Sequence, residues 1–125
     1  MSLRSTSTVV VGAGAYGLGM SHALSGLGLD HLLLERGPSG DAWRSRRWQN
    51  LRLLTPNWAN GLPGAPYAGP DPDAFMAATA FADGLDSYRH AIAAPVQSGT
   101  YVTGVELRDG GFELATTQGP IHCQN

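Results

Sequence analysis

Three aliphatic residues stand directly before a glycine-rich loop near the start of the chain. In VVVGAGAYG, residues 9–17, Gly12, Gly14 and Gly17 have the spacing G-x-G-x-x-G. The residues from Thr8 to Val11 predict a buried strand. Such a spacing between a strand and a helix is typical of a loop that brings backbone close to the pyrophosphate of a dinucleotide. This opening therefore predicts a strand-to-helix turn with a nucleotide beside it.

The residues after the loop predict a helix and then a second strand. Residues 15–28, AYGLGMSHALSGLG, end in two glycines and read as a helix. HLLLE, residues 31–35, is apolar and has the length of a buried strand. A helix between two apolar strands implies parallel pairing with a right-handed crossover, the first unit of a doubly wound sheet. The apolar residues at helical spacing are Tyr16, Met20, Ala23, Leu24 and Leu27.

An acidic residue stands where the second strand is predicted to end. Glu35 follows Gly12 by 23 residues. A carboxylate at this place accepts hydrogen bonds from the hydroxyls of an adenosine ribose. Its charge would repel a 2′-phosphate, which favours FAD or NAD over NADP. The alternative is a glycine-rich turn without a ligand, but strand, helix, strand and acid in register favour the nucleotide.

Composition narrows the class of protein. A chain of 125 residues is enough for one domain with one core. All 8 basic residues are Arg, and the net charge of −2 offers no footprint for nucleic acid or an anionic membrane surface. The single Cys123 cannot form an internal disulfide, and the polar N-terminus has no apolar segment for a signal peptide or a membrane span. We therefore expect a cytoplasmic protein with no nucleic-acid or membrane partner.

Residues 36–72 form a long segment of Gly, Pro, Arg and Trp with little periodicity. Loops of this length inside a compact domain are usually functional. Here the chain resembles the FAD-binding part of the flavin-containing monooxygenases, especially their bacterial branch. The segments that carry the resemblance are VVVGAGAYGL, LLLERG, GDAWRSRRWQNLRLLTP, GLPG and GTYVTGVE. Five motifs in order over most of the chain are far more specific than one glycine loop.

The resemblance implies FAD as the ligand. The glycine loop would hold the pyrophosphate, and Glu35 would hold the adenosine ribose. The glycines divide the work: Gly12 permits the tight turn, Gly14 lets backbone approach the pyrophosphate, and Gly17 lets helix and strand pack closely. The residues assigned to FAD are Gly12, Gly14, Ala15, Tyr16, Gly17, Glu35, Arg36, Trp43, Thr55 and Val102.

Four positions after the second strand depend on the resemblance alone. Trp43 would line the channel beside the ribityl and flavin portion, although Asp41 replaces a glycine of the family's G-G-x-W motif. Thr55 would lie where backbone passes under the flavin ring, and Val102 where backbone meets the adenine edge. An aliphatic residue, Leu53 or Leu54, stands where some branches place a polar side chain near the flavin. We therefore name no catalytic residue.

The aromatic and basic residues of this region have structural alternatives. Trp43 could cover the edge of the sheet, and for Trp48 and Trp58 that reading is the better one. Half of all the Arg residues lie in residues 44–52, RSRRWQNLR. They could face a cofactor or form a solvated surface cluster, and both readings stay open.

Two chemistries find no residues to support them. Disulfide reductases of related architecture place a pair of cysteines against the flavin, but residues 36–60 contain no Cys. We therefore exclude dithiol chemistry. The four His residues have no second ligand at metal-binding spacing, so no metal site is expected.

The last third of the chain predicts a helix and a small antiparallel sheet. Residues 73–90 read as a helix with Asp73 as N-cap and an interruption near Gly84. A short third strand is expected at Val96. TYVTGVELR, GFELATTQ and PIHCQ alternate with period two and predict a three-stranded antiparallel meander. The expected fold is α/β: a Rossmann-like FAD-binding domain over residues 1–125, with a parallel sheet plus the meander.

Family members would continue with a further parallel strand beside the first one and with a second G-x-G fingerprint for NADPH, whereas this chain stops at Asn125. The NADPH-binding domain is thus expected to be absent. We interpret the chain as the FAD-binding portion of a monooxygenase-like oxidoreductase whose small-molecule substrate is unassigned. The alternative is a non-catalytic dinucleotide-binding or interaction module. An exposed sheet edge would make the chain marginally stable and prone to self-association.

Overall fold

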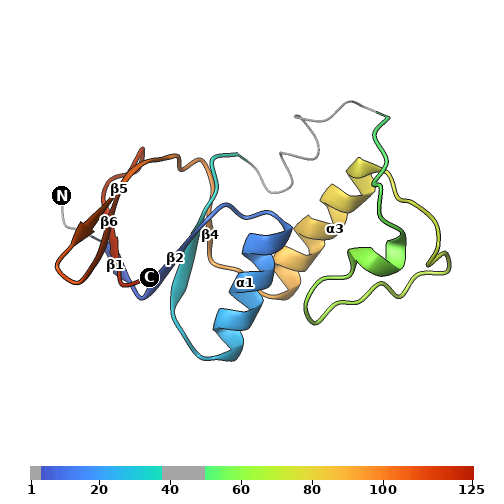
Figure 1. Ribbon diagram of the computed structural model, residues 1–125, viewed down its shortest axis with the longest axis horizontal. Helices are drawn as coiled ribbons and strands as arrows, with labels where there is room; N and C mark the ends of the chain where they lie inside the picture. Colours follow the sequence, from blue (N-terminus) through green and yellow to red (C-terminus); the bar gives the residue numbers. More distant parts are fainter. Residues whose placement is uncertain (1–3, 38–49) are drawn as a thin grey trace.

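The computed structural model describes residues 4–37 and 50–125. Two sheets lie next to each other, and two α-helices pack on one side of the parallel sheet (Figure 1). No helix of the described residues has the length and apolar character needed to cross a membrane. The predicted α/β class, with a parallel sheet and an antiparallel meander, is confirmed.

The three-stranded parallel sheet has the order β2-β3-β4. Its strands are β2 (Thr8–Val11), β3 (His31–Leu34) and β4 (Val96–Gln97). Continuous apolar runs favour such strands because both faces of a parallel sheet are covered. All three strands lie where the sequence predicts them, and the helix between β2 and β3 makes the expected parallel crossover.

Helix α1 (Ala15–Gly26) follows the glycine loop. It ends in a Schellman motif, in which the N–H of Leu29 donates to the carbonyl of Leu24 at 3.0 Å and the N–H of Gly28 donates to that of Ser25 at 3.0 Å. Gly28 has a φ of +70°, in the left-handed region that this motif needs. The predicted end of the helix at the two glycines is confirmed.

The face of α1 that the structure buries differs from the predicted stripe. Of the five apolar residues at helical spacing, only Leu24 is buried, and Tyr16 is 97% exposed. The rotation of the helix is set instead by Gly17, which packs against the backbone of Gly12. The buried side chains of α1 are Leu18, Ser21 and Leu24.

Ser21 ties α1 to β3 through His31. The Nδ1 atom of His31 lies 3.0 Å from the carbonyl oxygen of Leu29, which can only accept, so Nδ1 carries the proton. The Nε2 atom then accepts the hydroxyl hydrogen of Ser21 at 2.7 Å. Because Ser21 is fully buried, this bond satisfies a hydroxyl that would otherwise be costly to bury.

Residues 50–77 fold back on themselves before the second helix. Arg52 and Ala77 form an antiparallel bridge, and the N–H of Leu53 donates to the carbonyl of Met76 at 2.9 Å. A short 3-10 helix, η1 (Asn57–Asn60), lies between these two limbs.

Helix α3 (Ala78–Ala91) begins later than predicted. The expected N-cap, Asp73, lies outside it in a turn, where the N–H of Ala74 donates to the carbonyl of Asp71 at 3.2 Å. The bridge at Ala77 keeps the residues directly before the helix extended. The expected interruption is also wrong, since Gly84 lies within a continuous helix. Pairing with a distant segment, which local sequence does not reveal, decides where this helix starts.

The four-stranded sheet has the order β1-β7-β6-β5. Its strands are β1 (Arg4–Thr6), β5 (Val102–Arg108), β6 (Gly111–Thr116) and β7 (Ile121–Cys123). β5, β6 and β7 pair antiparallel in sequence order, which confirms the predicted meander. β1, which the sequence analysis does not predict, pairs parallel with β7.

The chain passes from one sheet to the other at Ser7, between β1 and β2. The carboxylate of Asp30 accepts hydrogen bonds from the N–H of Ser7 and the hydroxyl of Thr6, each at 3.0 Å. These bonds hold the pKa of Asp30 below its ordinary value. On the other side, Asn125 donates its N–H to the carbonyl of Ser7 at 3.1 Å and accepts the N–H of Val9 at 3.0 Å.

The two sheets have separate cores that meet at β3. Leu33 and Leu34 are adjacent, so their side chains point to opposite faces of the strand. Leu33 packs in a core with both helices, whereas Leu34 packs in a core with the meander. The first core contains Ala13, Leu18, Leu33, Leu85 and Tyr88, and the second contains Leu34, Leu114, Ile121 and Cys123.

Candidate functional site

The three glycines of the loop have three different surroundings. Gly12 has a φ of +102°, a left-handed conformation that favours glycine, and its N–H donates to the carbonyl of Leu34 at 2.7 Å. A Cβ on Gly17 would clash with the carbonyl of Gly12, whereas a Cβ on Gly14 would meet nothing within 4 Å. The turn therefore needs glycine at Gly12 for its conformation and at Gly17 for close packing. At Gly14 it leaves open space.

The N-terminus of α1 presents free backbone donors. Gly14 is the N-cap, and no side-chain hydrogen bond caps the helix there. The N–H of Leu18 donates to the carbonyl of Gly14 at 2.9 Å, so the preceding N–H groups of the first turn have no acceptor within the helix. These donors and the positive end of the helix dipole favour an anion at this position. Ala15 and Tyr16 lie in this turn. The ring of Tyr16 is exposed, so these two residues can offer an anion their backbone N–H groups.

A cavity of about 250 Å³, here called the β2–β3 cavity, lies where these two strands end. Three separate stretches of chain form its wall: residues 11–12, 34–36 and 100–102. Four of the residues predicted to bind a nucleotide therefore lie together: Gly12, Glu35, Arg36 and Val102. The full lining is Val11, Gly12, Leu34, Glu35, Arg36, Thr100, Tyr101 and Val102.

The backbone of Glu35 is fixed on both sides. Its N–H donates to the carbonyl of Gln97 at 3.0 Å, and its carbonyl accepts the N–H of Thr100 at 3.0 Å. The Oε2 atom of its carboxylate accepts the N–H of Arg36 at 3.0 Å, which orients the side chain. A half-buried carboxylate held in this way can accept hydrogen bonds from the hydroxyls of a bound ligand.

Thr100 and Tyr101 are lining residues that the sequence analysis does not name. Thr100 is 2% exposed, and its hydroxyl donates to the carbonyl of Ser98 at 3.2 Å and accepts the side-chain amide of Gln97 at 3.0 Å. Tyr101 is 52% exposed, and its N–H donates to the hydroxyl of Thr117 at 3.0 Å. The available signal was the aromatic residue directly before Val102 in TYV, because aromatic rings stack on bases.

Of the residues predicted to lie near the flavin, those that the structure describes do not line this cavity. Thr55 lies in the segment before α3, where its hydroxyl donates to the side chain of Asn60 and its carbonyl accepts the amide of that residue at 3.1 Å. Of the two aliphatic positions, Leu53 is buried and Leu54 is 93% exposed. Trp43 lies outside the described residues, as do Asp41, Trp48 and residues 44–47.

The structure also shows where Trp58 and Arg52 lie. Trp58 lies in η1 and is 64% exposed, so the expectation that it covers the edge of a sheet is wrong. Arg52 donates to the carbonyl of Phe75 at 2.8 Å, which gives this member of the Arg-rich stretch a structural contact. Within residues 4–37 and 50–125, no three His, Cys, Asp or Glu side chains come close enough to hold a metal ion.

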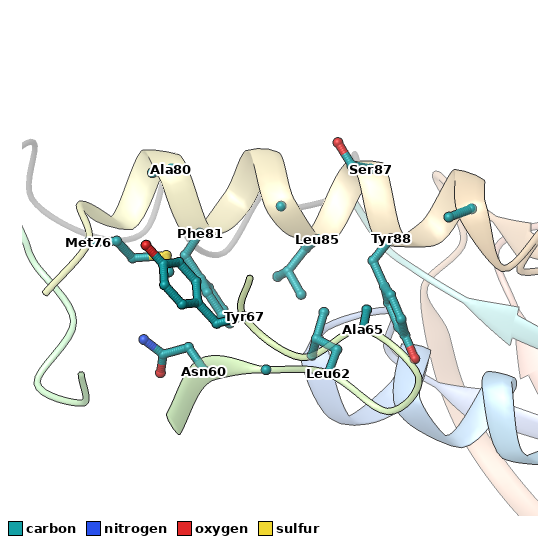
Figure 2. A pocket seen from close by; sticks show the side chains of 13 residues that line it. Asn60, Leu62, Ala65, Tyr67, Met76, Ala80, Phe81, Leu85, Ser87 and Tyr88 are labelled. Atoms are coloured by element: carbon teal, nitrogen blue, oxygen red, sulfur yellow. The ribbon is translucent and has the colours of Figure 1, made fainter. Parts of the chain in front are cut away.

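A second cavity, of about 370 Å³, lies between α3 and residues 60–67 and is here called the α3 cavity (Figure 2). Figure 2 shows Phe81, Leu85 and Tyr88 pointing from α3 towards the chain that carries Leu62 and Tyr67. It shares no lining residue with the β2–β3 cavity. Its lining is Asn60, Gly61, Leu62, Ala65, Tyr67, Met76, Ala80, Phe81, Gly84, Leu85, Ser87, Tyr88 and Ala91.

Comparison with known proteins adds the family to this geometry. Residues 9–125 match the family model described as pyridine nucleotide-disulphide oxidoreductase. The chain belongs to this family. The match begins in β2 and includes the glycine loop, the end of β3 and the whole meander.

Two proteins similar to this chain are named as an oxidoreductase and as a flavin-containing monooxygenase. An uncharacterized CzcO-like oxidoreductase of Geobacillus kaustophilus (strain HTA426) is 30% identical over 112 residues, which are 89% of this chain and 32% of the relative. A flavin-containing monooxygenase from Stenotrophomonas maltophilia has a TM-score of 0.87 and 26% identity, over 98% of this chain and 37% of that one. The predicted resemblance to flavin-containing monooxygenases is confirmed.

A third similarity concerns the fold alone. The structure of OTEMO in complex with FAD and NADP has a TM-score of 0.80 and 21% identity, and the match covers 94% of this chain and 24% of OTEMO. The chain therefore spans between about a quarter and somewhat more than a third of the length of these three proteins.

Proposed function

We propose that this chain binds FAD, with the adenosine portion in the β2–β3 cavity, as the FAD-binding portion of a flavin-dependent monooxygenase-like oxidoreductase. The observation that carries the proposal is that Gly12, Glu35, Arg36 and Val102 line one cavity. Gly12 also joins that cavity to the N-terminus of α1, where backbone donors favour an anion. Phosphate and adenosine would thus bind to adjoining parts of the same turn.

Each part of the adenosine diphosphate finds a suitable group. The pyrophosphate would accept hydrogen bonds from the first turn of α1, over the open space at Gly14. The ribose hydroxyls would donate to Glu35. The adenine would lie against the exposed ring of Tyr101, with its edge at the backbone of Val102. A cavity of about 150 Å³ holds a benzene ring, so about 250 Å³ suits the adenosine end and not the whole of FAD.

The flavin end of the cofactor is proposed from the resemblance. Trp43 would line the ribityl channel, and Thr55 would lie under the flavin ring. FAD, when bound, supplies the redox chemistry, while the residues of this chain bind and orient it. No residue of this chain is assigned to NADPH, to a small-molecule substrate or to catalysis. The single Cys123 is free and buried, which fits a reducing compartment such as the cytoplasm.

Self-association is a further part of the proposal. Among the described residues, β2 forms one edge of the parallel sheet, where the N–H of Val9 is bonded to the carbonyl of Asn125, and β5 forms one edge of the other sheet. Unpaired N–H and C=O groups at such edges are templates for pairing with another chain. We infer that purified chains associate through one of these edges.

Calorimetric titration of the purified chain tests the proposed function. FAD and ADP should both bind and should compete, because they share the adenosine diphosphate. Riboflavin, which lacks that part, should not displace ADP. A chain that binds neither FAD nor ADP would contradict the proposal, and a chain that binds ADP without FAD would favour the non-catalytic dinucleotide-binding module.

A further inference from the structure

The walls of the α3 cavity are held by hydrogen bonds that leave its interior apolar. The hydroxyl of Tyr88 donates to the carbonyl of Pro63 at 2.6 Å, and the hydroxyl of Tyr67 accepts the N–H of Asp71 at 3.2 Å. Between these two rings, Leu62 and Ala65 exchange backbone hydrogen bonds at 3.0 Å and 2.7 Å. The loop opposite α3 is therefore fixed in place, and the cavity is formed before any ligand arrives.

The lining determines what kind of molecule the cavity can accept. None of the 13 lining residues is Asp, Glu, Lys, Arg or His, so an ionic ligand would find no counter-charge. Three aromatic rings and several aliphatic side chains form most of the surface. The polar side chain that faces the loop is Asn60, whose amide lies beside the Tyr67 ring in Figure 2 and bonds Thr55 with one of its two N–H groups. The Ser87 hydroxyl points to the other side of α3 in that view. This combination suits an uncharged, largely apolar molecule with one hydrogen-bonding group.

The side of the cavity formed by α3 is lined partly by small side chains. Ala80, Gly84, Ser87 and Ala91 all belong to the lining. All four are exposed, and a Cβ on Gly84 would meet no atom within 4 Å, so the cavity opens to solvent along this part of the helix. A side chain added at Gly84 would therefore extend towards the volume that a ligand would use.

We propose that the α3 cavity is a binding site for a small, uncharged, apolar molecule of about two fused rings. A cavity of about 150 Å³ accepts one benzene ring, and pockets for small molecules begin at about 300 Å³. The α3 cavity, at about 370 Å³, is in this range. The α3 cavity shares no residue with the β2–β3 cavity proposed for the adenosine end of FAD. It adjoins Thr55, which is proposed to lie under the flavin ring, because Thr55 is hydrogen-bonded to the lining residue Asn60.

A neutral fluorescent molecule, N-phenyl-1-naphthylamine, tests this site in the 125-residue chain. We expect a saturable rise in fluorescence with one molecule bound per chain. Gly84→Phe should weaken binding at least about tenfold, because the ring occupies the cavity. The matched control is Gly26→Phe in α1, where a Cβ also meets nothing within 4 Å and which lies outside this cavity. The control should bind as the parent does.

A second variant, an anionic probe and light scattering test the proposal further. Ser87→Phe, also on α3, repeats the test if Gly84→Phe fails to fold as judged by circular dichroism. The anionic analogue 8-anilino-1-naphthalenesulfonate should bind more weakly than the neutral compound. Equal binding by the parent and both filled variants would overturn the proposal. So would light scattering that shows a dimer which both filled variants dissociate, because the cavity would then be a contact between two copies. ADP, which would bind only in the β2–β3 cavity, should titrate the same variants as it does the parent.

Discussion

The backbone of Gly17 packs directly against the carbonyl group of Gly12. A Cβ on Gly17 would lie well inside van der Waals contact of that oxygen, and the neighbouring atoms are backbone that cannot turn away. Gly12 is itself fixed, because its N–H donates to the carbonyl of Leu34. The contact between these two glycines therefore joins the first turn of α1 to the ends of β2 and β3.

Replacing Gly17 should damage the fold before it damages binding. Gly17→Ala forces the helix away from the turn, and overpacking of this kind costs about 1–3 kcal/mol. For a domain of this size, each kcal/mol lowers the melting temperature by roughly 2–8 °C. Thermal unfolding by circular dichroism measures the effect, with Gly26→Ala as the control because a Cβ there has no neighbour within 4 Å. Equal melting temperatures for the two variants would contradict the close contact.

Replacing Gly14 should impair FAD binding more than folding. The φ of Gly14 is −82°, which any residue can adopt, and its Cβ position is open. Gly14→Val should therefore fold, with a smaller fall in melting temperature than Gly17→Ala, since the only cost is that valine is a poorer N-cap residue than glycine. It should lose FAD, because the side chain fills the space proposed for the pyrophosphate. If the variant purifies with as much flavin absorbance as the parent, the pyrophosphate binds elsewhere.

Glu35→Ala should weaken FAD and ADP alike. The carboxylate is proposed to accept charge-assisted hydrogen bonds from the ribose, each worth about 1.5–3 kcal/mol, so a loss of at least about tenfold in affinity is expected. Calorimetric titration provides the measurement. Asp73→Ala, an exposed acidic residue outside the cavity, is the control. Unchanged affinity in Glu35→Ala would place the ribose away from the end of β3.

Tyr101 should contribute through its ring and not its hydroxyl. Stacking of a base on an aromatic side chain is worth about 1–3 kcal/mol on substitution by alanine. Tyr101→Ala should therefore bind ADP roughly 5- to 150-fold more weakly, while Tyr101→Phe should bind it as the parent does. Loss of affinity in both variants would assign the effect to the hydroxyl, and no loss in either would remove Tyr101 from the site.

The junction at Ser7 should be sensitive to acid. The hydrogen bonds from Ser7 and Thr6 lower the pKa of Asp30 in the folded state. A lowered pKa stabilises the fold above the unfolded carboxyl pKa of about 3.9, and this stability is lost as the pH falls through the folded-state pKa. Melting temperatures measured from about pH 6 to about pH 2.5 should fall less steeply in Asp30→Asn than in the parent. Parallel curves would show that Asp30 does not contribute.

The strands and the glycine loop could be predicted from the sequence because their signals are local. An apolar run before Gly12 and another before Glu35 indicate buried parallel strands without knowledge of the rest of the chain. The period-two alternation after Thr100 likewise predicts the meander. The spacing of the glycine loop and the position of Glu35 then indicate two of the stretches of chain that line the β2–β3 cavity.

The remaining features depend on distant contacts. Apolar residues lie all around α1, so periodicity alone does not reveal which face is buried, and the contact of Gly17 with Gly12 decides it. The start of α3 depends on the bridge between Arg52 and Ala77. The α3 cavity depends on how residues 60–67 return to the helix, which no local pattern indicates.

The β2–β3 cavity has a consequence for the order of events during synthesis of the chain. β2, α1 and β3 can pair as soon as the residues up to Leu34 have left the ribosome, but the wall formed by Thr100, Tyr101 and Val102 is made much later. Glu35 is held by hydrogen bonds to Gln97 and Thr100, so its backbone also waits for that segment. A nascent chain would therefore complete the proposed nucleotide site only after β4 has joined the sheet.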